Sequence, residues 1–442
     1  MTIHPNFLHE FSKKTKEEKI HIISSFSGDK EYTSELLKSF VHPDERLQEK
    51  FDEFSENTIS NFPFPFGIAP NFMINGHVYH VPMVIEESSV VAAAANAAKF
   101  WSQRGGFHTR IISAVKSGQV HFTFSGNAAQ LLLHQQTIEL KLLERVLPVS
   151  QKMIQRGGGV LSVNIKNSTD LIPNYYQLDV RFNTVDSMGA NFINSCLEEM
   201  AGGLEEYLHK AFPDEKTDII MSILSNYNPE CLVESMVECR VEELKKIHPD
   251  FTPAEFIRKF AVAVEIAKKN VSRATTHNKG IMNGVDAVVL ATGNDFRAVE
   301  AGVHAWASRG GHYASLTDTD YSEGWFRYRL TMPLSLGTVG GLTSLHPLAR
   351  LSLEILENPS ANDLMQIAAS AGLANNFSAI RALVTWGIQK GHMMMHLSNI
   401  LNTLEASDEE KRTAREYFHG QKVSFSLVSE FIKSLRNETV KK

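Results

Sequence analysis

Hydrophobic residues recur along the chain with two different spacings, and each change of spacing marks a predicted change of secondary structure. Residues 17–26 and 33–42 carry apolar side chains at helical spacing, whereas residues 77–87 form a dense apolar and β-branched run that is typical of a strand. The alanine-rich segment that follows is predicted to be a helix, with Ser88 or Ser89 as its N-terminal cap. Glu87 therefore lies at a strand-to-helix corner, where a carboxylate can face a cleft.

The pattern between about residues 117 and 226 alternates strand, helix, two strands, helix and strand. The predicted strands are residues 119–126, 159–167, 175–183 and 217–226, and the predicted helices are residues 128–154 and 188–212. This β-α-β-β-α-β order is that of a ferredoxin-like domain. We therefore predict a small self-contained domain that is inserted into a larger one.

Helical patterns return after this domain, in residues 231–247 and 254–270. The short apolar run AVVLA at residues 287–291 is predicted to be a buried strand, and Asp295 is predicted to cap the amphipathic helix that follows. The apolar face of that helix is formed by Phe296, Val299, Val303 and Trp306. Residues beyond Trp386 predict a helical C-terminal part.

Together these elements predict an α+β fold with a large domain of mixed helices and strands, an inserted ferredoxin-like domain and a helical C-terminal part. The 442 residues exceed what one hydrophobic core commonly serves, so two or three domains are expected. The predicted boundaries are residues 1–113 and 229–386 for the large domain, 114–228 for the inserted domain and 387–442 for the C-terminal part.

Composition and charge disfavour several classes of function. The hydrophobic share of 43% and the charged share of 21% are those of an ordinary folded protein, and the net charge of −6 offers no basic surface for nucleic acid or an anionic membrane. No secretory signal and no apolar run of roughly 18 residues, the length that spans a bilayer, is recognisable. Cys196, Cys231 and Cys239 form no CxxC pair. We expect a cytoplasmic protein with free buried thiols, no metal, and no membrane or nucleic-acid partner.

Lys279 and Asp295 are candidates for chemistry on a carbonyl group. Lys279 stands in HNKGIMNG, which reads as a loop, and the strand predicted at residues 287–291 would bring it and Asp295 to one rim. An ammonium group there stabilises the alkoxide that forms when hydride reaches a carbonyl carbon. The plainer interpretations stay open, because a lysine is commonly a solvated surface charge and Asp295 can be only a helix cap.

Glu87 and His392 are candidate proton donors. A carboxyl group shielded from water can give a proton to an aldehyde oxygen, although the helix N-terminus beside Glu87 favours the anion and paired acids commonly just face solvent. His392 and His396 have a spacing that permits a metal pair, but the glutamate of HExxH is missing. We prefer His392 as an imidazole that protonates a departing thiolate near neutral pH.

A dinucleotide site of the Rossmann type is not indicated, because no GxGxxG follows a predicted strand. The start of the second inserted helix, residues 188–191, offers instead a helix N-terminus that can receive a pyrophosphate. The glycine run at residues 157–159 permits a close backbone approach to a ligand. A dinucleotide bound to the inserted domain is therefore chemically compatible with the sequence but not required by it.

Four segments resemble, in this order, the signature segments of class II hydroxymethylglutaryl-coenzyme A reductases: EESSVVAAAANAAK, DSMGANFIN, HNKGIMNGVDAVVLATGNDFRAVEAG and GIQKGHMMMH. The resemblance runs from about Asn71 to Asn399. It implies a four-electron reduction of hydroxymethylglutaryl-coenzyme A to mevalonate and coenzyme A with two NAD(P)H in isoprenoid metabolism, or the reverse oxidation. It also implies a homodimer or larger homo-oligomer whose active site is completed across the dimer interface.

The resemblance also implies roles for individual residues. Lys279 would stabilise the oxyanion, Glu87 would be the acid of the mevaldehyde step, Asp295 would orient the lysine, and His392 would protonate the coenzyme A thiolate from a mobile C-terminal flap. The residues implied for substrate binding are Ser89, Arg273 and Asn226. The residues implied for cofactor binding are Asp186, Met188, Gly189, Ala190 and Asn191, together with Ser150 and Lys152.

Ser150 stands where NAD-dependent members of that family carry an acidic residue that binds the adenosine ribose. A serine with Lys152 nearby tolerates a 2′-phosphate better than a carboxylate does, which favours NADPH and the biosynthetic direction. Ser60 and Ser12 also depart from the family pattern and leave the coenzyme A contacts open. Two other hypotheses are an NAD-linked enzyme that oxidises mevalonate and a non-catalytic regulatory protein that binds coenzyme A or a nucleotide. A pure binder, however, has no need of an acid, a lysine and a thiolate donor together.

Overall fold

The computed structural model describes residues 7–245, 247, 251–385, 397, 400–418, 421 and 423–439. The chain divides into two units, of which the first is residues 1–65 with 345–347 and the second is residues 66–344 with 348–442. Both helices and strands are abundant, and they confirm the predicted α+β class.

The first unit is built from short helices that begin at side-chain caps. Their bounds are η1 Phe11–Lys13, α1 Lys16–Ser24, α2 Lys30–Ser39 and α3 Glu45–Asp52. Thr15 and Glu18 form a reciprocal capping box at the start of α1, and an aspartate side chain caps each of the next two helices. The helices predicted at residues 17–26 and 33–42 are therefore confirmed.

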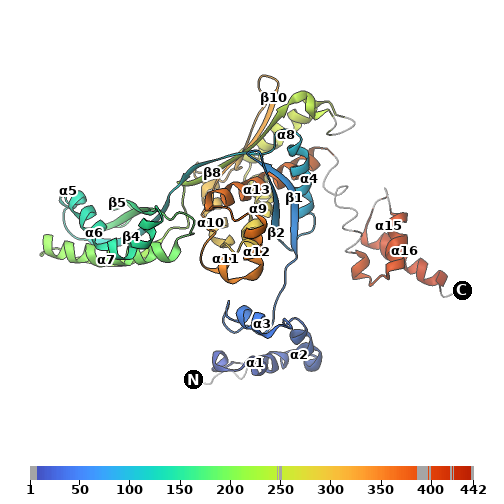
Figure 1. The fold of residues 1–442 in the computed structure, drawn as a ribbon, viewed down its shortest axis with the longest axis horizontal. Helices are drawn as coiled ribbons and strands as arrows, with labels where there is room; N and C mark the ends of the chain where they lie inside the picture. Colours follow the sequence, from blue (N-terminus) through green and yellow to red (C-terminus); the bar gives the residue numbers. More distant parts are fainter. Residues whose placement is uncertain are drawn as a thin grey trace. The chain divides into compact units, whose positions relative to one another are not determined.

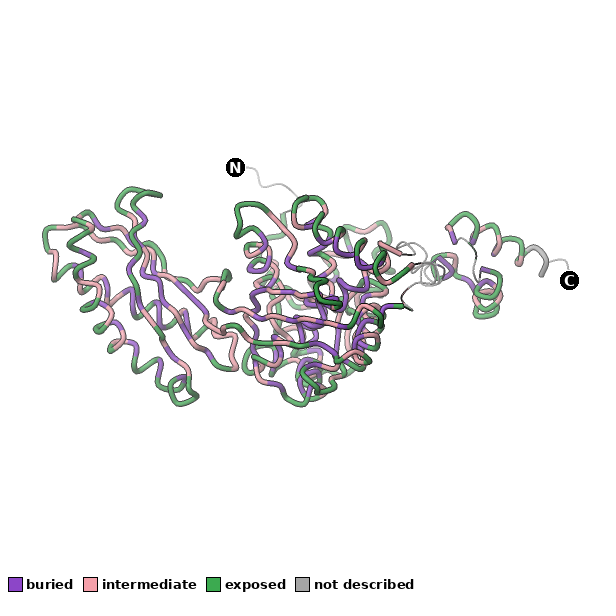
Figure 2. The backbone as a smooth tube through the Cα atoms, turned by 90° about the horizontal axis from the view of Figure 1, so that it is seen from above, coloured by how far each residue is buried: buried purple, intermediate pink, exposed green. Residues whose placement is uncertain are grey.

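The inserted segment folds into a four-stranded antiparallel sheet with two long helices packed on it (Figure 1). Its elements are β4 Lys116–Phe124, α5 Ala128–Leu133, α6 Gln135–Gln155, β5 Gly159–Asn167, β6 Tyr175–Asn183, α7 Ala190–Ala211 and β7 Thr217–Leu224. The strand order is β5-β6-β4-β7, and the predicted β-α-β-β-α-β succession is confirmed. Buried and exposed residues alternate along both long helices (Figure 2), because one face of each packs on the sheet.

One detail of this domain differs from the prediction. The helix predicted at residues 128–154 is interrupted at His134, which separates α5 from α6. The Nδ1 atom of His134 lies 2.6 Å from the hydroxyl of Tyr207 on α7. The break therefore places His134 in contact with α7.

The remainder of the second unit, apart from its C-terminal helices, contains a hairpin, a second four-stranded sheet and the central helices α9 and α13. The strands are β1 Phe66–Ile74, β2 His77–Val84, β3 His108–Ala114, β8 Cys231–Arg240, β9 Thr317–Asp320 and β10 Trp325–Pro333, and the sheet order is β3-β8-β10-β9. The helices are α4 Val90–Ser102, η2 Val241–Leu244, α8 Pro253–Lys269, α9 Val271–Ala291, α10 Phe296–Ala307, α11 Leu342–Leu345, α12 Pro347–Ile355 and α13 Ala361–Val384.

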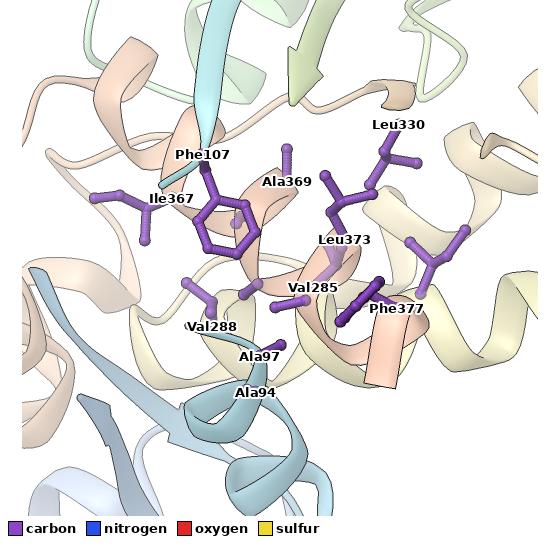
Figure 3. Packing of buried hydrophobic residues seen from close by; sticks show 14 of the residues in the cluster. Ala94, Ala97, Phe107, Val285, Val288, Leu330, Ile367, Ala369, Leu373 and Phe377 are labelled. Atoms are coloured by element: carbon purple, nitrogen blue, oxygen red, sulfur yellow. The ribbon is translucent and has the colours of Figure 1, made fainter. Parts of the chain in front are cut away.

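The core of this part lies where α9 and α13 pack side by side. Val285 and Val288 of α9 share it with Leu373 and Phe377 of α13, and the ring of Phe107 lies among them (Figure 3). Glycines permit this close approach, because a Cβ atom on Gly284 would stand 2.3 Å from the carbonyl oxygen of Ala371.

Residues 231–240, which we predicted to be helical, form the strand β8 instead. Every second residue from Cys231 to Cys239 is buried and those between are half-buried, which is the period of a strand. The helical interpretation was wrong because β8 is an inner strand between β3 and β10, so apolar residues occur on both of its faces.

The strand predicted at residues 287–291 is also wrong, because these residues are the end of α9. A short apolar run cannot distinguish a buried strand from a buried helix, and this end of α9 is enclosed in the core. Lys279 consequently lies within a helix and not in a loop.

The C-terminal part contains α15 Asp408–Tyr417 and α16 Phe425–Thr439, which pack around a small hydrophobic cluster of their own. Ser407 and Glu410 form a capping box at α15, and Glu410 also pairs with Arg436 at 2.7 Å. His392 and His396 lie outside the described residues. Along the described ranges, every helix is too short or too polar to cross a membrane.

Candidate active site

Glu87 and Lys279 meet at the corner between β2 and α4. Glu87 lies in the short connection between these elements, as predicted, and β2 packs against α9, which carries Lys279. The Nζ atom of Lys279 donates a hydrogen bond to Oε2 of Glu87, and the amide of Asn283, one turn further along α9, lies 3.5 Å from the same oxygen. The two charged side chains are 58% and 42% exposed, so a ligand can reach them from solvent.

Buried polar groups hold the part of α9 that carries Lys279. His277 is almost fully buried, and its Nε2 atom lies 2.7 Å from the hydroxyl of Thr317 while its carbonyl oxygen accepts a hydrogen bond from Asn376 at 2.7 Å. Burial, with the charge of Arg273 nearby, lowers the pKa of His277 to about 3. His277 is therefore a neutral anchor of the helix, and its function was missed in the sequence because a buried histidine has no local signature.

Arg273 lies near the start of α9 and is half-buried. Its backbone amide is capped by Asn270 at 2.8 Å, but its guanidinium group forms no ion pair with any carboxylate of the described residues. Burial lowers the pKa of Arg273, yet an arginine keeps its charge at neutral pH. A half-buried cation without a protein carboxylate is suited to an anionic ligand.

Ser89 takes the cap position of α4 but does not cap it with its side chain. Its φ of 78° lies in the left-handed region, and the helix start shows no side-chain cap hydrogen bond, so the predicted serine cap is wrong. Ser89 stands two residues after Glu87, on the same corner. Asn226 is placed elsewhere, just after β7, where it lines a small cavity with Met188.

Asp295 caps α10, as predicted, and accepts hydrogen bonds from the amides of Arg297 and Ala298 at 3.1 and 3.2 Å. No hydrogen bond or ion pair joins it to Lys279 within the described part of the chain. Ala291 lies twelve positions after Lys279 along α9, a distance of about 18 Å at the usual helical rise. The predicted meeting of Lys279 and Asp295 through an intervening strand is therefore wrong within one chain.

Asp295 instead lines an open pocket of about 440 Å³ together with the turn before α7. Two glycine-rich stretches and the end of α6 complete it; its lining residues are Met153, Arg156, Ser187, Met188, Gly189, Ala190, Asn191, Phe192, Gly293, Asn294, Asp295, Gly337, Val339, Gly340, Gly341, Leu342 and Thr343. The structure thus places the predicted residues 188–191 and Asp295 around one pocket.

The backbone approaches closely in this pocket because two glycines leave no room for a side chain. Gly189 has a φ of 91°, and a Cβ atom on it would stand 2.4 Å from the side chain of Thr184. A Cβ atom on Gly337 would stand 2.3 Å from the backbone nitrogen of Met188. The first residues of α7 line the pocket, and no side chain caps the amides at this helix N-terminus.

Asp186 fixes this turn and does not line the pocket. Its Oδ1 atom accepts a hydrogen bond from the first amide of α13 at Ala361, 2.8 Å away, and its carbonyl oxygen accepts one from Thr338, also at 2.8 Å. The carboxylate of Asp186 therefore holds the turn in position. This geometry does not favour the direct contact with the cofactor that we predicted for Asp186.

Ser150 and Lys152 were predicted to contact the cofactor, but neither lines the pocket. Ser150 is 1% exposed, and its hydroxyl lies 3.6 Å from the sulfur of Cys196 in the core between α6 and α7. Lys152 points to solvent from another face of α6. Arg156, just past the end of α6, lines the pocket instead, and its guanidinium group forms no ion pair with a described carboxylate.

The comparisons with known proteins agree on one family. The sequence profile of the family described as hydroxymethylglutaryl-coenzyme A reductase matches residues 15–397. A 3-hydroxy-3-methylglutaryl-coenzyme A reductase of Archaeoglobus fulgidus is 33% identical over 97% of this chain and 94% of its own length. A probable reductase of the same name from Borreliella burgdorferi is 32% identical over 88% of each chain.

Solved structures from Streptococcus pneumoniae show the same fold. A 3-hydroxy-3-methylglutaryl-coenzyme A reductase of that organism superposes with a TM-score of 0.71 and 32% identity, over 97% of this chain and 99% of its own. A class II reductase bound to NADPH in open conformations superposes with a TM-score of 0.69 and 34% identity, over 85% of this chain and 99% of its own.

These matches define the chain as an NAD(P)H-dependent oxidoreductase. It belongs to the hydroxymethylglutaryl-coenzyme A reductase family, in class II of that family.

Proposed function

We propose that this chain reduces 3-hydroxy-3-methylglutaryl-coenzyme A to mevalonate and coenzyme A, while two NAD(P)H are oxidised to two NAD(P)⁺ and two protons are consumed. The contact between Lys279 and Glu87 carries the proposal, because it sets an ammonium group and a proton-donating acid side by side at an accessible corner. Reduction of a thioester needs both groups, since an oxygen first becomes negative and is then protonated.

The substrate would bind over this corner. Arg273 would hold the terminal carboxylate of the hydroxymethylglutaryl group, because its half-buried guanidinium has no carboxylate partner among the described residues. Ser89, at the same corner as Glu87, would donate a hydrogen bond from its hydroxyl to an oxygen of the acyl group. Asn226 would contribute from the edge of the inserted domain.

Three side chains would stabilise charge and supply protons during the two reductions. When bound, a reduced nicotinamide supplies hydride to the carbonyl carbon. Lys279 stabilises the oxygen that becomes negative, and Glu87 gives a proton to the aldehyde oxygen in the second reduction. His392, which lies outside the described residues, protonates the coenzyme A thiolate that leaves between the two reductions.

The pocket at residues 187–192 fits the diphosphate of a nicotinamide dinucleotide. Uncapped amides at the start of α7 and side-chain-free backbone at two glycines are what a pyrophosphate requires. Arg156 is the cation suited to a 2′-phosphate, in place of Ser150 and Lys152. NADPH is therefore the preferred cofactor.

The active site is completed by a second copy of the chain. Glu87 and Lys279 lie on one side of α9, and Asp295 and the cofactor pocket lie beyond its far end, about 18 Å away along the helix. A homodimer that places the Lys279 corner of one subunit against the Asp295 pocket of the other closes this distance in both sites at once, since a two-fold interface is self-complementary.

The domains would divide the work as their residues suggest. Residues 114–228 form the cofactor domain, residues 1–113 and 229–386 form the substrate domain, and residues 387–442 form a flap that carries His392. A cytoplasmic location is favoured by Cys196, Cys231 and Cys239, which are all free and buried.

The test is to follow the absorbance of NADPH and of NADH separately, with hydroxymethylglutaryl-coenzyme A as the second substrate. Two molecules of NADPH should be oxidised for each thioester consumed, with NADH a poorer donor. Mevalonate and coenzyme A with each oxidised cofactor should give the reverse reaction more slowly. Binding of nucleotide and thioester without any turnover would establish the regulatory alternative.

A further inference from the structure

Lys116 is a buried cation that no step above uses. It is the first residue of β4, where the chain enters the inserted domain, and it is only 4% exposed. Its Nζ atom donates to the hydroxyl of Thr184 at 2.8 Å, to the carbonyl oxygen of Ser187 at 2.7 Å and to that of Leu336 at 3.4 Å. Its hydrogen-bond partners are thus all neutral oxygens, and among the described residues no carboxylate forms an ion pair with this buried cation.

The three oxygen atoms belong to segments that build the cofactor pocket. Thr184 and Ser187 close the turn that precedes α7, and the hydroxyl of Thr184 also donates to the carbonyl oxygen of Ser187 at 2.7 Å. Leu336 immediately precedes Gly337, which lies in close contact with the backbone of Met188. One ammonium group thus ties the turn to the glycine-rich stretch that lies beside it.

We propose that Lys116 is a positioning residue of the cofactor site, which holds the turn at residues 184–189 so that the first amides of α7 face the dinucleotide diphosphate. This inference rests on the proposed function of the pocket. Lys116 does not touch the cofactor and acts through Ser187 and Leu336.

The charge on Lys116 matters because of the number of its hydrogens. An ammonium group has three N–H donors for three acceptors, and a neutral amine has two. Burial lowers the pKa of Lys116 to about 8, and the carboxylate of Asp186 in the turn opposes that shift, as a thiolate of Cys231 on β8 would. Burial raises the pKa of the Cys231 thiol, which therefore stays protonated in the neutral range. As the pH rises through about 8, one of the three contacts is lost and cofactor binding weakens.

The experiment compares Lys116→Met with Asn228→Ala in the full-length protein. Asn228 is a matched control, since it is buried in the same junction and bonds Ser117, Ser225 and Ser335 at 2.8 to 3.0 Å but makes no hydrogen bond to the 184–189 turn. The dissociation constant for NADPH, measured from nucleotide fluorescence without thioester, should rise on the order of tenfold in Lys116→Met and stay unchanged in Asn228→Ala. The kcat at saturating NADPH should stay within about threefold of wild type.

A second pair of variants covers the case in which Lys116→Met does not fold. Thr184→Val keeps the shape of the side chain and removes one acceptor of Lys116, so it should weaken NADPH binding severalfold. Lys116→Arg keeps the charge at every pH and should abolish the loss of NADPH affinity that wild type shows above about pH 8.

Lower thermal stability with an unchanged NADPH dissociation constant in both Lys116→Met and Thr184→Val would overturn the proposal and leave Lys116 a structural residue. The same pH profile in wild type and Lys116→Arg would overturn its electrostatic part. Neither result touches the proposed function, which fails separately if wild type binds NADPH without oxidising it in the presence of the thioester.

Discussion

The Glu87–Lys279 corner and the cofactor pocket are built in opposite ways. At the corner two charged side chains meet in the open, each about half exposed, and one hydrogen bond joins them. The pocket is formed largely by backbone. Its glycines lie in close contact with neighbouring residues, and hydrogen bonds from Lys116 and to Asp186 hold its turn. A ligand can displace the first arrangement but has to fit the second.

This difference indicates that the corner serves the chemical steps and that the pocket serves cofactor binding. An exposed ion pair contributes little to stability, so Lys279 and Glu87 are free to exchange partners during a reaction. A turn with buried hydrogen bonds keeps its amides in place before the ligand arrives, which reduces the cost of ordering on binding. Substitutions at the corner should therefore affect turnover, and substitutions in the pocket should affect cofactor affinity.

The largest effect is expected at the corner. Lys279→Met removes the charge that stabilises the oxyanion, so kcat should fall on the order of a thousandfold while the NADPH dissociation constant stays unchanged. Stopped-flow absorbance of NADPH measures the first quantity and fluorescence titration the second. Lys99→Met, at another exposed lysine of the second unit, serves as the control and should keep wild-type kinetics. A variant at Lys279 with normal turnover would remove this residue from the mechanism.

The next effect is expected in the pocket. Gly337→Ala forces a Cβ atom against the nitrogen of Met188 and should raise the NADPH dissociation constant roughly 10- to 100-fold, with a lower melting temperature. Gly310→Ala is the matched control, because a Cβ atom there meets nothing within 4 Å. Equal NADPH affinity in the two variants would show that the turn at Met188 is not part of the site.

A smaller change is expected at Arg156. Arg156→Met should lower the preference for NADPH over NADH about tenfold, because the loss is confined to the cofactor that carries the 2′-phosphate. Lys152→Met, one turn earlier and outside the pocket, should leave the preference unchanged. If the Lys152 variant loses selectivity and the Arg156 variant keeps it, the 2′-phosphate is bound by Lys152 and not by Arg156.

The smallest effect concerns stability and pH. Burial raises the pKa of Asp286 on α9, and its hydrogen bond with Glu300 on α10 and the charge of Glu300 raise it further. The folded state therefore keeps a proton that the unfolded chain loses above about pH 4, and the free energy of unfolding falls as the pH rises into the neutral range. Asp286→Asn should gain stability relative to wild type by roughly 2 to 3 kcal/mol between about pH 5 and pH 7, because one proton is worth about 1.36 kcal/mol per pH unit.

Urea unfolding at both pH values measures this difference, and the exposed Asp170→Asn provides the control. If the difference in the free energy of unfolding between Asp286→Asn and wild type is the same at both pH values, Asp286 holds no proton in the folded state.

The sequence predicted the elements whose period could be seen locally. The inserted domain is correct in its order of strands and helices, and Asp295 was recognised as a cap because an aspartate preceded an amphipathic segment. Lys279 was misplaced because Gly280 and Gly284 looked like loop residues. A glycine is needed at position 284 because of tertiary packing, since α13 contacts α9 there and leaves no space for a side chain.

Two failures in the site have a similar cause. Ser150 was assigned to the cofactor by its place before the glycine run, but Leu142, Val146 and Met153 share its helical face, and that face is buried. The helical spacing of the apolar residues alone could have excluded Ser150 from the cofactor site and left Arg156 as a candidate. The distance between Lys279 and Asp295, in contrast, depends on whether residues 287–291 form a strand or a helix, which an apolar run of five residues does not decide.

The most direct test of the account is complementation between subunits. Lys279→Met and Asp295→Asn are each prepared as inactive full-length proteins, with the second keeping a good cap for α10, and are then mixed so that subunits exchange. If Lys279 of one copy works with Asp295 of the other, half of the dimers are mixed, each has one intact site, and about a quarter of wild-type activity returns. No recovered activity, with mixed dimers demonstrated and wild type active, would contradict a site completed between two copies.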